Sequence, residues 1–203
     1  MAVEEINFPL ARRGPLLGTR LLGALGIVGA QMWVLDAVYR HVYGLGGGPN
    51  DRVSGALNLL YIIGWACSAV ALRRLRVTGR GLAASVAYAV QCMGLTLAGL
   101  ISLQEVLDLK ALAAHPLYPV VDAVWPLSHL FMLVVGALVW RAGVWRGWRR
   151  LPCFVCGLAL PAFFAAVPAL GEDARFVFII FVTTGFTLLG NAVRTAPIKE
   201  VSR

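Results

Sequence analysis

The chain has 203 residues, of which 59% are hydrophobic and 14% are charged, and its formal net charge is +8. Its mean hydropathy is +0.77. Soluble domains hold roughly 45–50% apolar and about 25% charged residues, so this composition excludes a disordered chain, a collagen-like chain and a disulfide-stapled secreted scaffold, and it indicates a surface that faces lipid.

Six stretches are long and apolar enough to cross a bilayer as helices, because a hydrocarbon core of roughly 30 Å needs about 20 residues. In chain order they cover approximately residues 16–39, 54–72, 82–102, 120–140, 151–170 and 176–193. They are continuously apolar and show no alternation of period two, so strands are not expected. The sequence predicts an all-α fold: one transmembrane domain over residues 1–203, built as a six-helix bundle.

Cations are distributed unevenly between the two ends of these predicted helices. Fourteen of the 18 Lys and Arg residues fall in the N-terminal arm and first turn, after the second and fourth stretches, and in the C-terminal tail. The other four are Arg40, Arg52, Lys110 and Arg175. The positive-inside rule therefore predicts an even number of spans with both termini cytoplasmic.

The positive charge predicts membrane lipids as partners, because basic loops attract anionic headgroups by roughly 1 kcal/mol per residue near the surface. No nucleic-acid partner is needed to explain it. Arg outnumbers Lys by 16 to 2, which is typical of a GC-rich bacterial genome, so we expect a multi-pass protein of the bacterial inner membrane. Small residues spaced four apart leave a homo-oligomer or partners in a membrane complex open as well.

Polar side chains within the predicted spans gather toward the end away from the cation clusters. Such groups are costly in a membrane and indicate functional sites by default. Asp122, Trp125 and His129 stand at i, i+3 and i+7, so they share one helix face. We predict an outward-facing pocket that binds a small molecule, a lipid headgroup or an ion, and its candidate residues are Asp36, Asn58, Tyr61, Asp122, Trp125 and His129.

This pattern favours a receptor-like, carrier or accessory protein over an enzyme, with carboxylates and His129 for charge or hydrogen bonds and aromatic rings for stacking or cation–π contacts. Two other interpretations stay open. The carboxylates are also compatible with a wet rim on which Arg40 and Arg52 are surface partners. The polar stripes are also compatible with a structural subunit of a larger membrane complex, in which His129 contacts a pigment or haem.

A CxxC motif, formed by Cys153 and Cys156, opens the fifth stretch directly after a pair of arginines. It resembles the motif of membrane thiol–quinone oxidoreductases of the disulfide-forming and vitamin-K-epoxide-reductase-like families. The resemblance covers five residues and implies a membrane thiol redox protein. Those enzymes work on the oxidising side with a second cysteine pair, whereas Cys67 and Cys92 lie in separate stretches. Two small apolar core residues are the alternative.

The sequence predicts no metal site and no bound cofactor. Its three histidines are His41, His115 and His129, and no HxxxH or HExxH spacing is present. A tetrapyrrole bound through His129, beside Trp125 and Phe131, is the one cofactor that is left open.

Overall fold

The computed structural model describes residues 17–45 and 51–196, and all regular secondary structure in these ranges is helical. This confirms the predicted all-α class for the described part of the chain. The α-helices are α1 (Leu17–Val42), α2 (Arg52–Arg74), α3 (Leu82–Val106), α4 (Lys110–Ala113), α5 (Tyr118–Asp122), α6 (Val124–Ala142), α7 (Pro152–Leu170) and α8 (Ala174–Arg194). Two 3-10 turns, η1 (Gly147–Arg150) and η2 (Gly171–Asp173), flank α7.

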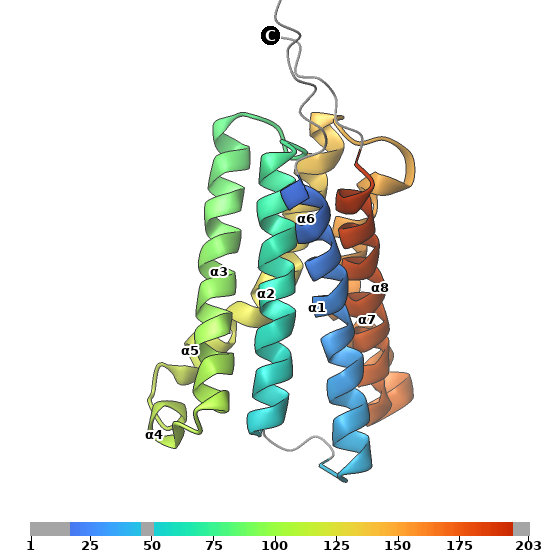
Figure 1. Cartoon of the computed structure of the whole chain (residues 1–203). Helices are drawn as coiled ribbons and strands as arrows, with labels where there is room; N and C mark the ends of the chain where they lie inside the picture. Colours follow the sequence, from blue (N-terminus) through green and yellow to red (C-terminus); the bar gives the residue numbers. More distant parts are fainter. Residues whose placement is uncertain (1–16, 46–50, 197–203) are drawn as a thin grey trace, which may run out of the picture.

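The long helices form a closed ring around a common interior (Figure 1). Helix α1 packs on α2 and α8, α2 packs on α3, α3 on α6, α6 on α7, and α7 on α8. The short helices α4 and α5 lie at the lower end of the view in Figure 1. Each long helix therefore turns one face to the interior and the opposite face outward, as a membrane bundle requires.

Within residues 17–45 and 51–196 the structure has five long apolar segments that could cross a membrane, where the sequence predicts six. The difference lies in the predicted fifth and sixth spans, which belong to one helical segment, Pro152–Arg194, of 43 residues. The two halves are joined by η2, which is only three residues long. Gly171 has φ = +56°, a conformation that suits glycine, and it turns the chain so that α7 and α8 pack side by side.

The predicted fourth span is also divided, at Ala123, into α5 and α6. Pro126 explains the break, because proline has no amide hydrogen for the carbonyl four residues earlier and its ring clashes with that carbonyl. The Ala123 amide donates to the Pro119 carbonyl, and the Leu127 amide donates to the Ala123 carbonyl. Asp122 therefore lies on α5, whereas Trp125 and His129 lie on α6.

Small residues bring α1 close to both of its neighbours. A Cβ atom added to Gly64 of α2 would lie 2.7 Å from the Cα atom of Gly29 on α1. A Cβ atom on Gly23 of α1 would lie 2.6 Å from the Gly190 carbonyl oxygen of α8. Close backbone approach of this kind is how helices gain packing energy in lipid. The small residues on these faces are thus used within the chain.

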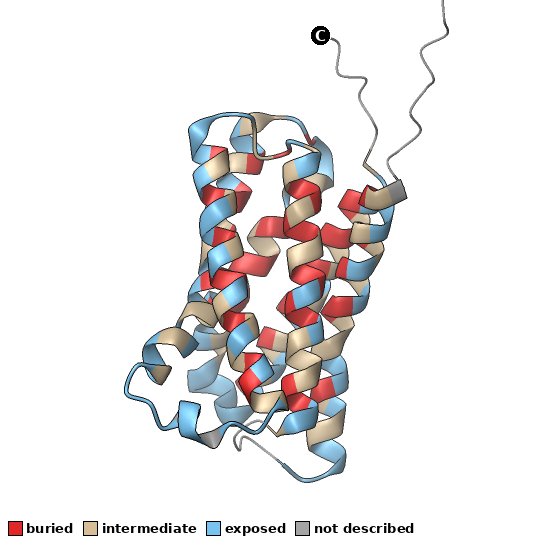
Figure 2. Cartoon of the chain, turned by 60° about the vertical axis from the view of Figure 1, so that its left-hand side comes forward, coloured by how far each residue is buried: buried red, intermediate tan, exposed pale blue. Residues whose placement is uncertain are grey.

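The outward faces of the helices are apolar. Large exposed side chains include Leu21 (59% exposed) on α1, Met93 (61%) on α3 and Ile180 (61%) on α8. Figure 2 shows the buried residues along the inward faces of the helices, while α4, α5 and the ends of the bundle are largely exposed. A multi-pass helical membrane protein has this distribution, because lipid tails solvate apolar side chains that water would not.

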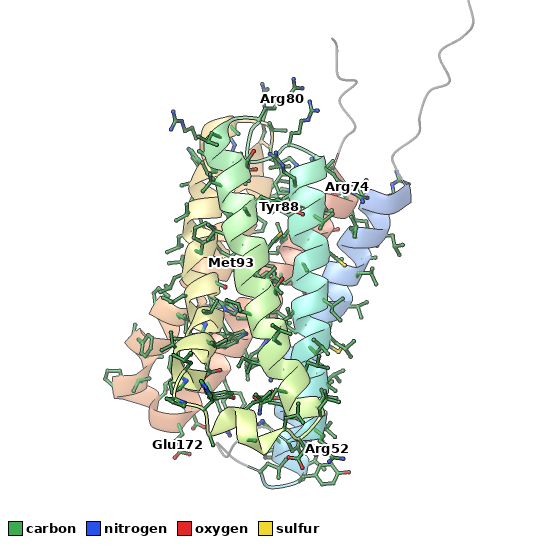
Figure 3. The ribbon with its side chains drawn as sticks, turned by 90° about the vertical axis from the view of Figure 1, so that its left-hand side faces the viewer. Arg52, Arg74, Arg80, Tyr88, Met93 and Glu172 are labelled. Atoms are coloured by element: carbon green, nitrogen blue, oxygen red, sulfur yellow. The ribbon has the colours of Figure 1, made fainter. Side chains whose placement is uncertain are left out.

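Arginines gather at one end of the bundle. The start of α1, the end of α2 and the end of α8 meet there, since Gly18 lies beside Arg74 and Gly23 beside Arg194. Figure 3 shows Arg74 and Arg80 at this end, and Arg52 and Glu172 at the other. We call it the arginine end; its described cations are Arg20, Arg73, Arg74, Arg76, Arg80, Arg141, Arg146, Arg149, Arg150 and Arg194. Both chain termini, with Arg12, Arg13, Lys199 and Arg203, fall outside the described residues.

Candidate functional site

Three aromatic rings meet inside the ring of helices. Trp33 of α1, Trp125 of α6 and Phe178 of α8 touch one another, with ring centroids 5.3 to 5.5 Å apart. We call these three rings the aromatic floor. They arise from three helices that are distant in sequence, and apolar helices place large rings inward where ring–ring contacts add to burial.

His129 lies directly behind the aromatic floor and is fully buried. Its ring is 4.7 Å from Trp125 and 4.6 Å from Trp65, measured between centroids. Both of its nitrogens have partners: Nδ1 is 3.1 Å from the Trp125 carbonyl oxygen, and Nε2 is 2.9 Å from the Tyr61 hydroxyl. Because a carbonyl only accepts, Nδ1 carries the proton, and in the neutral ring Nε2 accepts from the Tyr61 hydroxyl.

A cavity of about 620 Å³ lies on the other side of the aromatic floor, at the end of the bundle opposite the arginine end. Residues from all six long helices and from α5 line it. They are Trp33, Asp36, Ala37, Arg40, His41, Gly44, Asn58, Ala98, Ile101, Ser102, Glu105, Asp122, Trp125, Leu160, Phe163, Arg175, Phe176, Phe178 and Ile179. The size suits a small organic molecule, since such sites measure roughly 300–1,000 Å³.

An ion pair is built into the wall of this cavity. Asp36, 5% exposed, forms an ion pair with Arg40, one turn further along α1, with 3.3 Å between Oδ2 and Nε. The spacing i, i+4 places both side chains on the same helix face. A buried carboxylate would be costly without a partner, so Arg40 is what makes a charge tolerable at this depth.

The structure brings four of the six predicted site residues to the cavity. Asp36, Asn58, Asp122 and Trp125 line it, whereas Tyr61 and His129 lie behind the aromatic floor and are bonded to each other. Asp122 is exposed and Asp36 is buried, so the two carboxylates differ in their surroundings. The predicted common helix face of Asp122, Trp125 and His129 is divided, because Asp122 lies on α5 and the other two lie on α6. Trp125 lines the cavity, whereas His129 does not line it and packs against the Trp125 ring.

Several lining residues were not among the predicted site residues. Trp33 and Phe178 look like ordinary core residues in apolar helices, and only their convergence in space reveals the aromatic floor. Arg40 is not among the predicted site residues, although its i, i+4 spacing from Asp36 places the two on one helix face. Arg52, the other cation considered in that role, pairs instead with Asp108 at 3.4 Å, and both side chains are well exposed.

The residues around His129 do not fit a tetrapyrrole. An axial ligand needs a free nitrogen facing an open space, yet Nδ1 donates to a carbonyl and Nε2 is bonded to Tyr61. The aromatic rings of Trp65, Trp125 and Phe178 pack around the imidazole and leave no room for a macrocycle. Within residues 17–45 and 51–196, no three His, Cys, Asp or Glu side chains group as metal ligands would.

The two cysteines of the CxxC motif are fully buried at the start of α7. Cys156 packs against Gly185 of α8, where an added Cβ would lie 2.9 Å from its sulfur. Thiol chemistry requires a thiolate that a partner can reach. The cysteines are therefore placed as small core residues, away from the cavity, and the geometry gives no support to the redox interpretation.

No family model, curated protein or solved structure matches this chain.

Proposed function

We propose that this membrane protein binds a small molecule in the cavity, in a receptor-like, carrier or accessory role. The observation that carries the proposal is the cavity itself, with its polar residues on several helices and its closed aromatic floor. A bundle that served only as a scaffold would fill such a space with apolar side chains, because empty volume forfeits packing energy.

The cavity opens, in this proposal, to the outer side of a bacterial inner membrane. The arginine end then faces the cytoplasm, by the positive-inside rule, and contacts anionic headgroups. With α7 and α8 each crossing once, both chain termini are cytoplasmic. The alternative of a structural subunit has less support, since the small-residue faces of α1, α2 and α8 are used within the chain.

A cavity-blocking variant tests whether the cavity binds. Ala37 lines the cavity and is half-buried, so Ala37→Trp fills part of it; Ala165 is exposed on α7 away from the lining, so Ala165→Trp is the matched control. Purified proteins are melted in detergent with a library of soluble amines, carboxylates, alcohols and sugars. A ligand at 100 times its Kd stabilises by about 2.7 kcal/mol.

The proposal expects at least one compound that raises the melting temperature of the wild type and of Ala165→Trp by several degrees, but not that of Ala37→Trp. A library that shifts all three proteins equally, or none of them, overturns it. If Ala37→Trp fails to fold, Asn58→Phe blocks the same cavity from α2.

A further inference from the structure

The two ends of the bundle carry opposite charge. Within residues 17–45 and 51–196, every Asp and Glu lies toward the cavity end, and the arginine end holds only cations. At the cavity end, seven carboxylates outnumber the four cations, Arg40, Arg52, Lys110 and Arg175. The seven are Asp36, Asp51, Glu105, Asp108, Asp122, Glu172 and Asp173. Such an excess around a cleft raises the local concentration of cations and repels anions.

The cavity lining has one more carboxylate than it has guanidinium groups. Its three carboxylates are those of Asp36, Glu105 and Asp122, and its two guanidinium groups are those of Arg40 and Arg175. With histidine counted as neutral, the lining is therefore negative by one charge, although the whole chain carries +8. A charge in such a cavity is screened less than in bulk water, so the imbalance acts throughout the cavity and does not require any two side chains to point at one another. An occupant with one positive charge would balance it.

Aromatic rings form a second part of the cavity wall. Trp33 and Trp125 of the aromatic floor line the cavity and are half-buried, and Phe163 and Phe176 line it as well. Tryptophan is the side chain whose ring attracts a cation most strongly. The lining already holds one contact of this kind, since the guanidinium carbon of Arg175 lies 5.1 Å from the centroid of the Phe176 ring. The wall thus suits an occupant that is both cationic and apolar.

We propose that the cavity binds an organic cation with one positive charge, such as an amine or a quaternary ammonium compound with an apolar body. This inference rests on the proposed function, since it names the ligand class for the same cavity. The charge of the lining favours a cation over an alcohol or a carboxylate. The aromatic rings favour an organic cation over a metal ion, for which no group of three ligand side chains exists among the described residues.

Three probes of similar shape separate the possible charges: 2-phenylethylammonium, 2-phenylethanol and phenylacetate. Each is titrated against the wild type by melting temperature in an uncharged detergent at about pH 8, where an amine is protonated and imidazole is neutral. Ala37→Trp is the blank for partition into micelles. The ammonium probe is expected to bind about tenfold more tightly than the alcohol, and phenylacetate is expected to bind most weakly. Added salt should weaken the ammonium probe and leave the alcohol unchanged.

Two variants change the charge of the lining in opposite directions. Asp122→Asn removes a negative charge and should weaken the binding of 2-phenylethylammonium severalfold, whereas Arg175→Gln removes a positive charge and should tighten it severalfold. Neither should alter the binding of 2-phenylethanol, since a purely structural loss would weaken both probes. Glu172→Gln is the matched control, because Glu172 is exposed at the same end and does not line the cavity. It should leave the binding of all three probes unchanged.

Three results overturn the inference. If 2-phenylethanol or phenylacetate binds the wild type as tightly as the ammonium probe, and Ala37→Trp abolishes that binding, the proposed function stands while the organic cation fails. If Asp122→Asn and Arg175→Gln shift the ammonium affinity in the same direction, the charge of the lining does not select the ligand. If no probe separates the wild type from Ala37→Trp, the organic cation is again rejected, and the proposed function is judged on the wider library alone.

Discussion

His129 is buried among aromatic rings, and its two nitrogens are bonded to a backbone carbonyl of its own helix and to the hydroxyl of Tyr61 on α2. This pair links α2 to α6 across the interior of the ring, although the two helices are not neighbours around it. The fully buried imidazole of His129 is therefore a structural link between helices and not part of the cavity lining.

Tyr61→Phe tests this link. The change removes the hydroxyl and leaves Nε2 of His129 without a partner in a fully buried place, so the free energy of unfolding should fall by about 1–3 kcal/mol. Unfolding is measured by titration with SDS in mixed micelles. Tyr43→Phe is the control, because Tyr43 is 69% exposed and should show no change. An unchanged stability of Tyr61→Phe would show that the bond contributes nothing.

Asp51 caps the start of α2 and connects it to α1. Its Oδ1 accepts from the Ser54 amide at 2.9 Å, and its Oδ2 accepts from the Tyr39 hydroxyl. These bonds favour the charged form, so the pKa of Asp51 is held below its usual value, first by the Ser54 amide and then by Tyr39. A lowered pKa means that the charged carboxylate stabilises the fold above its unfolded pKa and loses this effect as the pH falls through the folded pKa.

Asp51→Ala should therefore lower the free energy of unfolding at pH 7 by about 1 kcal/mol, which is the usual value of an N-cap. The difference between wild type and variant should begin to shrink as the pH falls below the ordinary aspartate pKa of about 3.9, and it should be lost as the pH passes through the lower pKa of the folded carboxyl. Melting curves from pH 7 to pH 3 measure it. A difference that stays constant over this range would mean that the charge of Asp51 has no part in the cap.

At the scale of the elements, glycine positions decide how closely the helices approach. Gly64 and Gly29 face each other where α1 and α2 pack, and neither has room for a Cβ atom. Gly99 of α3 differs, since its nearest atoms are side-chain carbons at 3.8 and 3.9 Å. The same residue type is thus a close contact in one place and a helix position with free space in another.

Gly64→Ala and Gly99→Ala should therefore have opposite effects. The first forces α1 and α2 apart and should lower the free energy of unfolding by about 1–3 kcal/mol, as overpacking does. The second should raise it by about 0.5–1 kcal/mol, because alanine favours the helix over glycine. SDS titration of the two variants side by side measures the pair. Equal effects of both substitutions would contradict the close contact at Gly64.

The orientation of the whole bundle in the membrane decides on which side the cavity opens. The arginine end and the cavity end are opposite, so one measurement of orientation also places the cavity mouth. The division of the last apolar segment into α7 and α8 matters here, because it returns the chain to the end at which α1 starts.

Single cysteines in a background without the native cysteines give the orientation. Glu172→Cys lies at the cavity end and Gly81→Cys at the arginine end, and both positions are exposed. A membrane-impermeant maleimide added to intact spheroplasts should label Glu172→Cys and should reach Gly81→Cys only after the membrane is opened. The reverse pattern would place the cavity mouth in the cytoplasm.

The predictable part of this structure is the part that depends on local sequence. The helices α1, α2 and α3 begin and end within a few residues of their predicted stretches. The gathering of polar residues at one end of the bundle was also predictable. Asp36, Asn58 and Asp122 each lie in the part of their stretch that is away from the cation clusters. Two features were not: the break at Ala123, whose signal was Pro126, and the joining of α7 and α8 through a turn of three residues.

The sequence by itself determined that the chain is helical and apolar on its outside, and which ends of its helices carry the arginines. These properties follow from hydropathy and charge within about 20 residues, because lipid requires each segment to satisfy its own backbone hydrogen bonds. Only the tertiary structure decided that Trp125 faces the cavity while His129, one turn further along, lies behind it. Which residue of α6 lines the cavity depends on the rings that pack against it from other helices, here Trp33 of α1 and Phe178 of α8. Such contacts join segments that are distant in the sequence, so only the packing of the whole bundle sets them.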